Sequence, residues 1–346
     1  MPAITIDALK KIPGIEAKGV AIMSPNSQSF GVNDESSWKK FNVYGSLKHP
    51  FEMIKNIILA EYYLCKRILW ADVIIWQWDT RVYLPHFWFL KFCNKLILVE
   101  WVGSDIRVPE IVNVNNPYFK KAIENRTYSY LKESKARSNW IQMKFKFLNA
   151  IPWLCPEMTL FLNRNLFPDY IPTFQRIEVK KYKPVYPDQN KQKITIVHTP
   201  SALGAKGTNY VRTVIEKLKP EFDLEYIEIN KKTHVEALSA IASADIFLDQ
   251  FLGGSYGMST CEALAIGKPV FVYLMAPFIA ILPKDCPLVN ANGDTLEEIL
   301  KLYLLNPQLR YETGVKSRAY AEKYHDADKL SEELVEKLKT MLPTCN

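Results

Sequence analysis

Two short apolar segments, each followed by a polar loop that contains glycine and opens a helix, lie in the second half of the chain. They cover residues 194–197 and 245–248 and are rich in residues typical of buried strands. A helix that begins directly after such a loop carries unpaired backbone N–H groups and the positive end of its dipole. The pattern therefore predicts an α/β sheet whose loops bind an anion such as phosphate.

The loop after the second segment contains three closely spaced glycines. At these positions backbone amides can approach a ligand without an intervening Cβ atom. We expect the ring of Tyr256 to stack on a sugar or hydrogen-bond to it. The predicted ligand contacts of this loop are Gly253, Gly254, Ser255, Tyr256, Gly257 and Met258.

Two charged residues near these loops suit a nucleotide. Glu262 lies one turn into the helix predicted over residues 258–266, where a carboxylate can accept hydrogen bonds from a ribose diol. Lys206, beside Gly207, supplies a flexible cation for a diphosphate. Each residue alone could be an ordinary solvated side chain, but the order of strands, loops and helices over residues 194–274 favours the nucleotide site.

The segment Lys206-Gly207-Thr208 and the pattern GxYGxxxxEALAxGKPV at residues 254–270 resemble the C-terminal donor domain of GT-B glycosyltransferases, close to the retaining glycosyltransferase family 4. The resemblance covers residues 190–325. It implies an α/β GT-B fold with two Rossmann-like domains facing a cleft. The acceptor-binding domain would cover residues 1–185 and the nucleotide-sugar-binding domain residues 190–325, while a terminal helix at 326–346 crosses back to the N-terminal domain.

The same resemblance assigns roles to single residues. Lys206 matches the family's phosphate-binding lysine, and Glu262 matches the second glutamate of its E-x7-E motif, which holds the ribose. Gly254 stands in place of the first glutamate, and Ser201 stands where an arginine often partners the lysine. Together with Gly207, these residues complete the predicted donor site. The implied activity is transfer of a sugar, with retention, from a nucleotide diphosphate sugar to a glycan or lipid-linked acceptor in cell-surface glycan synthesis.

The N-terminal half shows the alternation of helices and strands expected of a second Rossmann-like domain. Helices are predicted at 4–12, 50–71 and 84–93, strands at 19–23, 72–77 and 95–101, and a polar loop at 26–40. Because a helix precedes the first strand, we expect this domain to lack the strand that usually opens a GT-B domain.

The strand that ends near Trp101 leads into Gly103 and Asp105, at the carboxyl edge where open α/β sheets bind ligands. Asp105 is the candidate for an acceptor-side catalytic role, including that of general base. The alternative is a helix cap or an Asx turn. His86 and His198 are isolated histidines, and we assign them no catalytic role.

Charge is divided unevenly along the chain. Residues 1–188 hold 26 Lys and Arg against 17 Asp and Glu, a net charge of +9, whereas residues 189–346 hold 18 against 20, a net charge of −2. The basic half contains the segment RSNWIQMKFKFLNAIPWL at residues 137–154. Its mixture of cations and aromatic rings suits an anionic membrane surface or an anionic acceptor. The alternative is an amphipathic helix whose aromatic residues belong to the core.

No cofactor or metal is expected besides the donor substrate. The six cysteines show no C-x-x-C spacing, and we identify no Asp-x-Asp metal motif. The N-terminus lacks a signal-peptide pattern, and charged residues interrupt the apolar region at 53–76. We therefore expect a cytoplasmic protein, with peripheral attachment to the inner face of the membrane left open.

Two other functional classes stay open. A non-catalytic, nucleotide-binding partner protein related to glycosyltransferases is favoured by Gly254, Ser201 and the helix that comes first. A nucleic-acid-binding or nucleic-acid-modifying protein is favoured by the basic half. However, the sequence contains no recognition module, and its cations do not form a run, so nucleic acid is not an expected partner.

Overall fold

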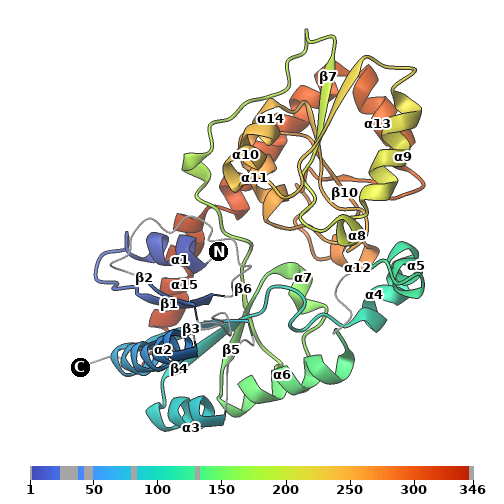
Figure 1. Cartoon of the computed structure of the whole chain (residues 1–346). Helices are drawn as coiled ribbons and strands as arrows, with labels where there is room; N and C mark the ends of the chain where they lie inside the picture. The colour runs from blue at the N-terminus through green and yellow to red at the C-terminus, as the bar shows by residue number, and fades with distance from the viewer. Residues whose placement is uncertain (1, 24–37, 43–49, 79–83, 129–132, 343–346) are drawn as a thin grey trace.

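The structure, a computed structural model, describes residues 2–23, 38–42, 50–78, 84–128 and 133–342. The chain forms two α/β halves, one above the other (Figure 1). Every strand pair in both halves is parallel among these residues. The predicted fold class, two domains built on parallel sheets, is therefore confirmed.

The N-terminal half contains two sheets. The first pairs β1 (Gly19–Met23) with β2 (Trp38–Asn42), and the second has the order β3 (Val73–Gln77), β4 (Leu96–Glu100), β5 (Ile151–Leu154), β6 (Ile171–Pro172). Neither β1 nor β3 has a partner on its other edge within the described ranges, so the sheet of this half is divided in two. Its helices are α1 (Pro2–Leu9), α2 (Pro50–Trp70), α3 (Leu84–Cys93), α4 (Pro109–Asn115), α5 (Pro117–Glu124), α6 (Lys135–Phe147) and α7 (Pro156–Thr159).

The C-terminal half is built on one five-stranded sheet. Its order is β11 (Val289–Asn290), β10 (Val270–Val272), β9 (Ile246–Leu248), β7 (Ile194–His198), β8 (Leu224–Glu228). The three central strands are fully buried, which explains their continuous apolar sequence. The main helices are α8 (Leu203–Lys206), α9 (Thr208–Leu218), α10 (His234–Ser243), α11 (Met258–Ile266), α12 (Ala276–Ile279), α13 (Leu296–Leu305) and α14 (Pro307–Tyr324).

Helices cover both faces of this sheet. Side chains of α9 and α13 form one core cluster against it, and those of α10, α11 and α14 pack on the opposite face. The helices α8 and α12, which follow β7 and β10, lie on the side that faces the N-terminal half (Figure 1). The carboxyl edge of the sheet, where ligands bind in open α/β folds, therefore faces the other half of the molecule.

The last helix, α15 (Ala327–Lys339), packs on the N-terminal half. Leu334 and Leu338 join the cluster formed by Leu98 and Trp153 of that half. Figure 1 shows α15 beside α1 at the other end of the chain. The chain thus crosses back to the N-terminal half after the C-terminal half is complete.

Two predicted elements differ from the structure. The end predicted for the polar loop at 26–40 is wrong, because β2 begins at Trp38. Residues 26–37 lie outside the described ranges. Residues 137–154 do not form one helix, since α6 ends at Phe147 and β5 follows. Asn149 adopts a left-handed backbone with φ of 59°, and such a residue ends a helix.

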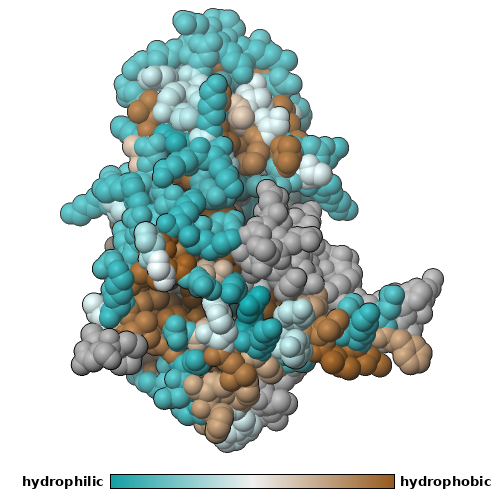
Figure 2. Space-filling view, turned by 90° about the vertical axis from the view of Figure 1, so that its left-hand side faces the viewer, coloured by the Kyte–Doolittle hydropathy of each residue, from teal (hydrophilic) through white to brown (hydrophobic). Residues whose placement is uncertain are grey.

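Figure 2 shows the face that contains the left-hand side of Figure 1. Hydrophobic residues gather over its lower part, which belongs to the N-terminal half, whereas the upper part is mainly hydrophilic. The helix α2 contributes several apolar side chains that are largely exposed, among them Phe51, Ile58 and Leu69.

Candidate functional site

Lys206 and the start of α11 meet through one buried carboxylate. Lys206 Nζ lies 2.6 Å from Asp249 Oδ1, directly after β9. The hydroxyls of Ser259 and Thr260, in the first turn of α11, donate to the same carboxylate at 2.9 and 2.6 Å. Burial opposes ionisation of Asp249, but Lys206 and the two hydroxyls outweigh it and lower its pKa. The structure therefore places the predicted lysine at the predicted anion-binding helix start.

The loop before α11 depends on glycine. Gly254 has a φ of 72°, and a Cβ atom there would lie 3.1 Å from the side chain of Met275. The side-chain amide of Gln250 donates to the carbonyl of Ser255 and fastens the loop internally. Gly257 is the N-cap of α11 and offers no side chain to the first-turn amides. These N–H groups are consequently available to a ligand.

Glu262 lies one turn further along α11 and is 9% exposed. Its Oε1 atom lies 2.7 Å from Nε2 of His234, the first residue of α10. The hydroxyl of Tyr182 donates to the same Oε1 atom at 3.3 Å. Neither partner was predicted from the sequence. His234 could have been suggested by its position after β8, because loops at the carboxyl ends of parallel strands share one edge; Tyr182 had no such signal.

Tyr256 is oriented differently from our expectation. Its ring is 2% exposed and packs against Phe278 and His325, with centroid distances of 5.6 and 5.8 Å. Stacking of this ring on a sugar does not fit that position, so Tyr256 contributes to the core and only its backbone belongs to the loop. Gly207 has a φ of 69° between α8 and α9, and Ser201 is exposed ahead of α8.

Asp105 is a turn-forming residue in this structure. It is 3% exposed, and its carboxylate accepts the backbone N–H groups of Gly103, Ile106 and Val102 at 2.9, 3.1 and 3.2 Å. Burial raises the pKa of Asp105 to about 6, against the effect of these hydrogen bonds. The Asx-turn alternative explains all of these contacts, and the general-base role does not fit a carboxylate so enclosed.

His198 is also structural. It is fully buried, with Nδ1 2.8 Å from the carbonyl of Leu248 and Nε2 2.9 Å from the hydroxyl of Thr208. Burial lowers the pKa of His198, which keeps the ring neutral. It joins β7, β9 and α9. His86 lies in α3, but its side chain is outside the described part of the structure.

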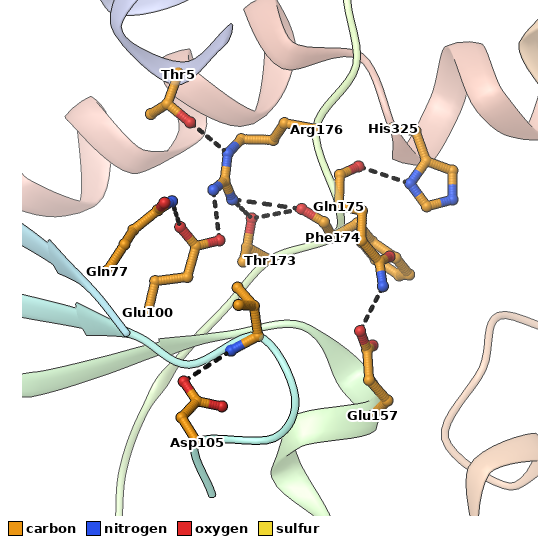
Figure 3. A network of polar contacts seen from close by, with 11 residues as sticks. Thr5, Gln77, Glu100, Asp105, Glu157, Thr173, Phe174, Gln175, Arg176 and His325 are labelled. Atoms are coloured by element: carbon orange, nitrogen blue, oxygen red, sulfur yellow. Dashed lines mark hydrogen bonds and ion pairs between the residues drawn. The ribbon is translucent and has the colours of Figure 1, made fainter. Parts of the chain in front are cut away.

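A buried ion pair anchors α1 to the central sheet of the N-terminal half (Figure 3). The guanidinium of Arg176 pairs with Glu100, and its Nε donates to the hydroxyl of Thr5 in α1 at 2.8 Å. The same guanidinium lies over the ring of Trp153 at 3.9 Å. The ion pair, the hydrogen bonds and the stacking together offset the free-energy cost of burying both charged groups.

A second polar group lies beside this pair in Figure 3. The side-chain amide of Gln175 donates to Glu157, and its backbone carbonyl lies 2.8 Å from Nδ1 of His325. Burial raises the pKa of Glu157 to about 7 and lowers the pKa of His325 to about 4. His325 is therefore uncharged at neutral pH, whereas Glu157 is about half protonated there and becomes neutral at lower pH.

The helix α5 links the two halves at the glycine loop. The side-chain amide of Asn116 donates to the carbonyl of Leu252 at 2.6 Å, immediately before the loop. The ring of Tyr118 packs edge-on against Tyr210 and Tyr273 of the C-terminal half, at centroid distances of 5.7 and 5.4 Å. The loop is thus held from the N-terminal half as well as from its own sheet.

Within the described ranges, no group of three or more His, Cys, Asp or Glu side chains is arranged to hold a metal ion. The chain has an Asp-x-Asp sequence at Asp326 and Asp328, outside the donor segment. There Asp326 caps α15, and Asp328 pairs with Lys11 at 2.6 Å and with Lys180 at 3.3 Å. No helix in the part of the chain that the structure describes combines the length and hydrophobicity of a membrane span.

No protein-family model matches this chain, and no curated protein matches it in sequence. Solved structures do match. Sucrose-phosphate synthase from Thermosynechococcus elongatus superimposes with a TM-score of 0.61 at 12% identity, over 97% of this chain and 91% of that one. The chain has the GT-B fold.

Two further GT-B structures are informative. Anabaena HepE, in complex with UDP and glucose, matches with a TM-score of 0.58 at 11% identity, over 87% of this chain and 86% of that one. WaaG, a glycosyltransferase involved in lipopolysaccharide biosynthesis, matches with a TM-score of 0.52 at 12% identity, over 96% and 93%. These likenesses establish the GT-B architecture, and the chemistry must be argued from the site itself.

Proposed function

We propose that this protein is a glycosyltransferase that transfers a sugar from a nucleotide diphosphate sugar to a glycan or lipid-linked acceptor. The observation that carries the proposal is the meeting of Lys206 with the first turn of α11 at the carboxyl edge of the sheet, with Glu262 one turn further. Because HepE binds UDP, we propose a UDP-sugar as the donor. The likeness to WaaG supports a role in cell-surface glycan synthesis.

Catalysis in this proposal rests on stabilising the leaving diphosphate with retention of configuration and without a metal. The first-turn amides of α11 and Lys206 supply positive charge where the leaving group develops negative charge. Lys206 is paired with Asp249, but an ammonium has three donors, so its other N–H groups can still bind a phosphate oxygen. The protein environment thus keeps the ammonium in place before the donor binds.

The N-terminal half would bind the acceptor and attach peripherally to an anionic membrane at the cytoplasmic side. Trp88 and Phe92 of α3 are 66% and 89% exposed, and Trp140 and Phe147 of α6 are 56% and 47% exposed. The ring of Trp88 packs edge-on against Phe147 at 5.8 Å, which joins the two helices into one apolar face. Lys144 lies 4.0 Å from the ring of Trp140, so cations border this face. Aromatic rings beside cations suit an anionic interface.

Calorimetry with UDP, UDP-glucose and UDP-N-acetylglucosamine tests the donor site directly. We expect UDP binding that Glu262→Gln and Lys206→Ala weaken. Release of UDP from a bound nucleotide sugar, with or without added acceptor, then tests turnover. Absence of UDP binding at millimolar concentration would contradict the proposed UDP-dependent activity.

A non-catalytic nucleotide-binding protein is the second candidate. It is favoured by Gly254, which offers no carboxylate to a donor sugar, and by the enclosed carboxylate of Asp105. The two candidates differ in one measurement: nucleotide binding without release of UDP from any nucleotide sugar, across a panel of glycan acceptors, would support the second.

A further inference from the structure

The two oxygens of Glu262 have different surroundings. Oε1 contacts His234 at 2.7 Å and Tyr182 at 3.3 Å, whereas no hydrogen bond to Oε2 is found among the residues that the structure describes. Both partners come from outside α11: His234 opens α10, and Tyr182 belongs to the segment between the two halves. One oxygen is therefore occupied by the protein, and the other remains for a ligand.

We propose that His234 and Tyr182 are positioning residues that fix the carboxylate of Glu262 through Oε1, so that Oε2 is presented to the ribose diol of the donor. The proposal rests on the proposed function, because it concerns the nucleotide half of the same site. A glutamate side chain has several rotatable bonds, and a ligand that orders it loses affinity. Anchoring one oxygen before binding removes much of that cost.

Both anchors are themselves held in place. The backbone carbonyl of Tyr182 accepts a hydrogen bond from Arg318 at 2.7 Å, and the same guanidinium nitrogen donates to the carbonyl of Ala265 in α11 at 2.6 Å. The segment that carries Tyr182 is thus fastened to the helix that carries Glu262. On the other side, a capping box between Thr233 and Glu236 fixes the start of α10 and with it the backbone of His234.

The chemistry of His234 suits an anchor at neutral pH. A neutral imidazole can keep the proton on Nε2 and donate it to Oε1, and an imidazolium donates from the same atom. The side chain of His234 is 40% exposed while that of Glu262 is 12% exposed. His234 therefore covers the carboxylate on its solvent side without being part of the core, so it can be replaced with little effect on folding.

The experiment compares UDP with 2′-deoxy-UDP by calorimetry on the full chain. The dissociation constant of 2′-deoxy-UDP divided by that of UDP measures recognition of the diol. For the wild type we expect a ratio of about 10 to 100, the range of hydrogen bonds to a charged group. Glu262→Gln should bring the ratio close to one. His234→Leu and Tyr182→Phe should lower it by about three- to tenfold while affinity for 2′-deoxy-UDP stays unchanged.

Two controls separate positioning from general damage. His234→Gln retains an amide donor and should recover part of the lost ratio. Tyr303→Phe removes a hydroxyl that contacts Thr313 at 3.2 Å and should leave the ratio at the wild-type value. Thermal unfolding of each variant verifies that the fold is retained.

The outcomes distinguish this inference from the proposed function. A wild type that does not bind UDP overturns the proposed UDP-dependent activity and this inference with it. A wild type that discriminates the diol, with the same ratio in His234→Leu and Tyr182→Phe, overturns the inference alone. Equal loss of affinity for both nucleotides in these variants also overturns it, because that result describes a general structural role.

Discussion

Lys206 and Asp249 form a buried ion pair that holds the predicted phosphate-binding lysine in place, and its disruption should destabilise the fold. Their side chains are 13% and 1% exposed, and among the described residues the carboxylate keeps two hydroxyl donors, Ser259 and Thr260, when the lysine is removed. Removing one partner of a buried pair costs about 3–5 kcal/mol, since the remaining charge stays buried without compensation. The two hydroxyls continue to stabilise the carboxylate, so for Lys206→Ala we expect about 3 kcal/mol, at the lower end of that range.

The pH dependence of this loss follows from the same pair. Lys206 holds the pKa of Asp249 below its usual value. Without the lysine, burial raises the pKa of Asp249, so the variant takes up a proton at a higher pH than the wild type. The destabilisation should therefore be largest above neutral pH and shrink as the pH falls and the carboxyl becomes neutral.

Urea unfolding at pH 8 and pH 5 measures both effects. Lys217→Ala is the matched control, because Lys217 pairs with Glu297 at 3.0 Å with side chains 60% and 32% exposed. Because solvent screens that exposed pair, its removal should change the free energy of unfolding far less than Lys206→Ala does. The double variant Lys206→Met/Asp249→Asn removes both charges and should regain most of the lost stability. A loss below about 1 kcal/mol for Lys206→Ala would refute the reasoning.

Three further predictions concern other parts of the molecule. Burial raises the pKa of Glu157 to about 7 in the folded protein, so the stability that its neutral form contributes is fully present below the pKa of the unfolded chain and is lost as the pH rises through 7. In urea unfolding, the free energy of unfolding of Glu157→Gln should therefore rise by about 3 kcal/mol relative to that of the wild type between pH 4.5 and pH 8. A difference between variant and wild type that does not change with pH would contradict this. Liposome co-sedimentation should show binding to anionic but not neutral vesicles at low salt, and Lys144→Glu/Lys146→Glu should abolish it while UDP binding is kept. Donor turnover should survive EDTA; loss of activity that added metal restores would contradict the metal-free mechanism.

The parts of the fold that the sequence predicted are those determined locally. The helix expected at 258–266 is α11, and it ends at Gly267, whose φ is 85°. A Cβ atom at that position would lie 2.7 Å from the ring of Tyr186, so glycine is required both by the backbone and by packing. Lys206 and the loop of α11 were likewise predictable, because both follow strands of one parallel sheet and must therefore lie at one edge.

The parts that the sequence did not predict depend on which side chains meet across long separations. Asp249 was not singled out, although it joins Lys206 to the first turn of α11. Tyr256 was assigned to a ligand because it lies in a glycine loop, but its ring packs against His325, 69 positions away. Sequence position fixes where a backbone loop lies relative to a sheet edge, while the direction of each side chain depends on packing from other elements.

The two oxygens of Glu262 show how this limit affects functional interpretation. The sequence predicted Glu262 as a site residue with a ribose as its ligand, but not that His234 and Tyr182 contact one of its oxygens. A carboxylate with both oxygens unoccupied could accept a diol in several orientations. With Oε1 anchored, Oε2 is the oxygen without a hydrogen bond among the described residues, and in our proposal the ribose approaches from that side. The specificity of the donor site then depends on α10 and on the segment between the two halves, as well as on the helix that carries the glutamate.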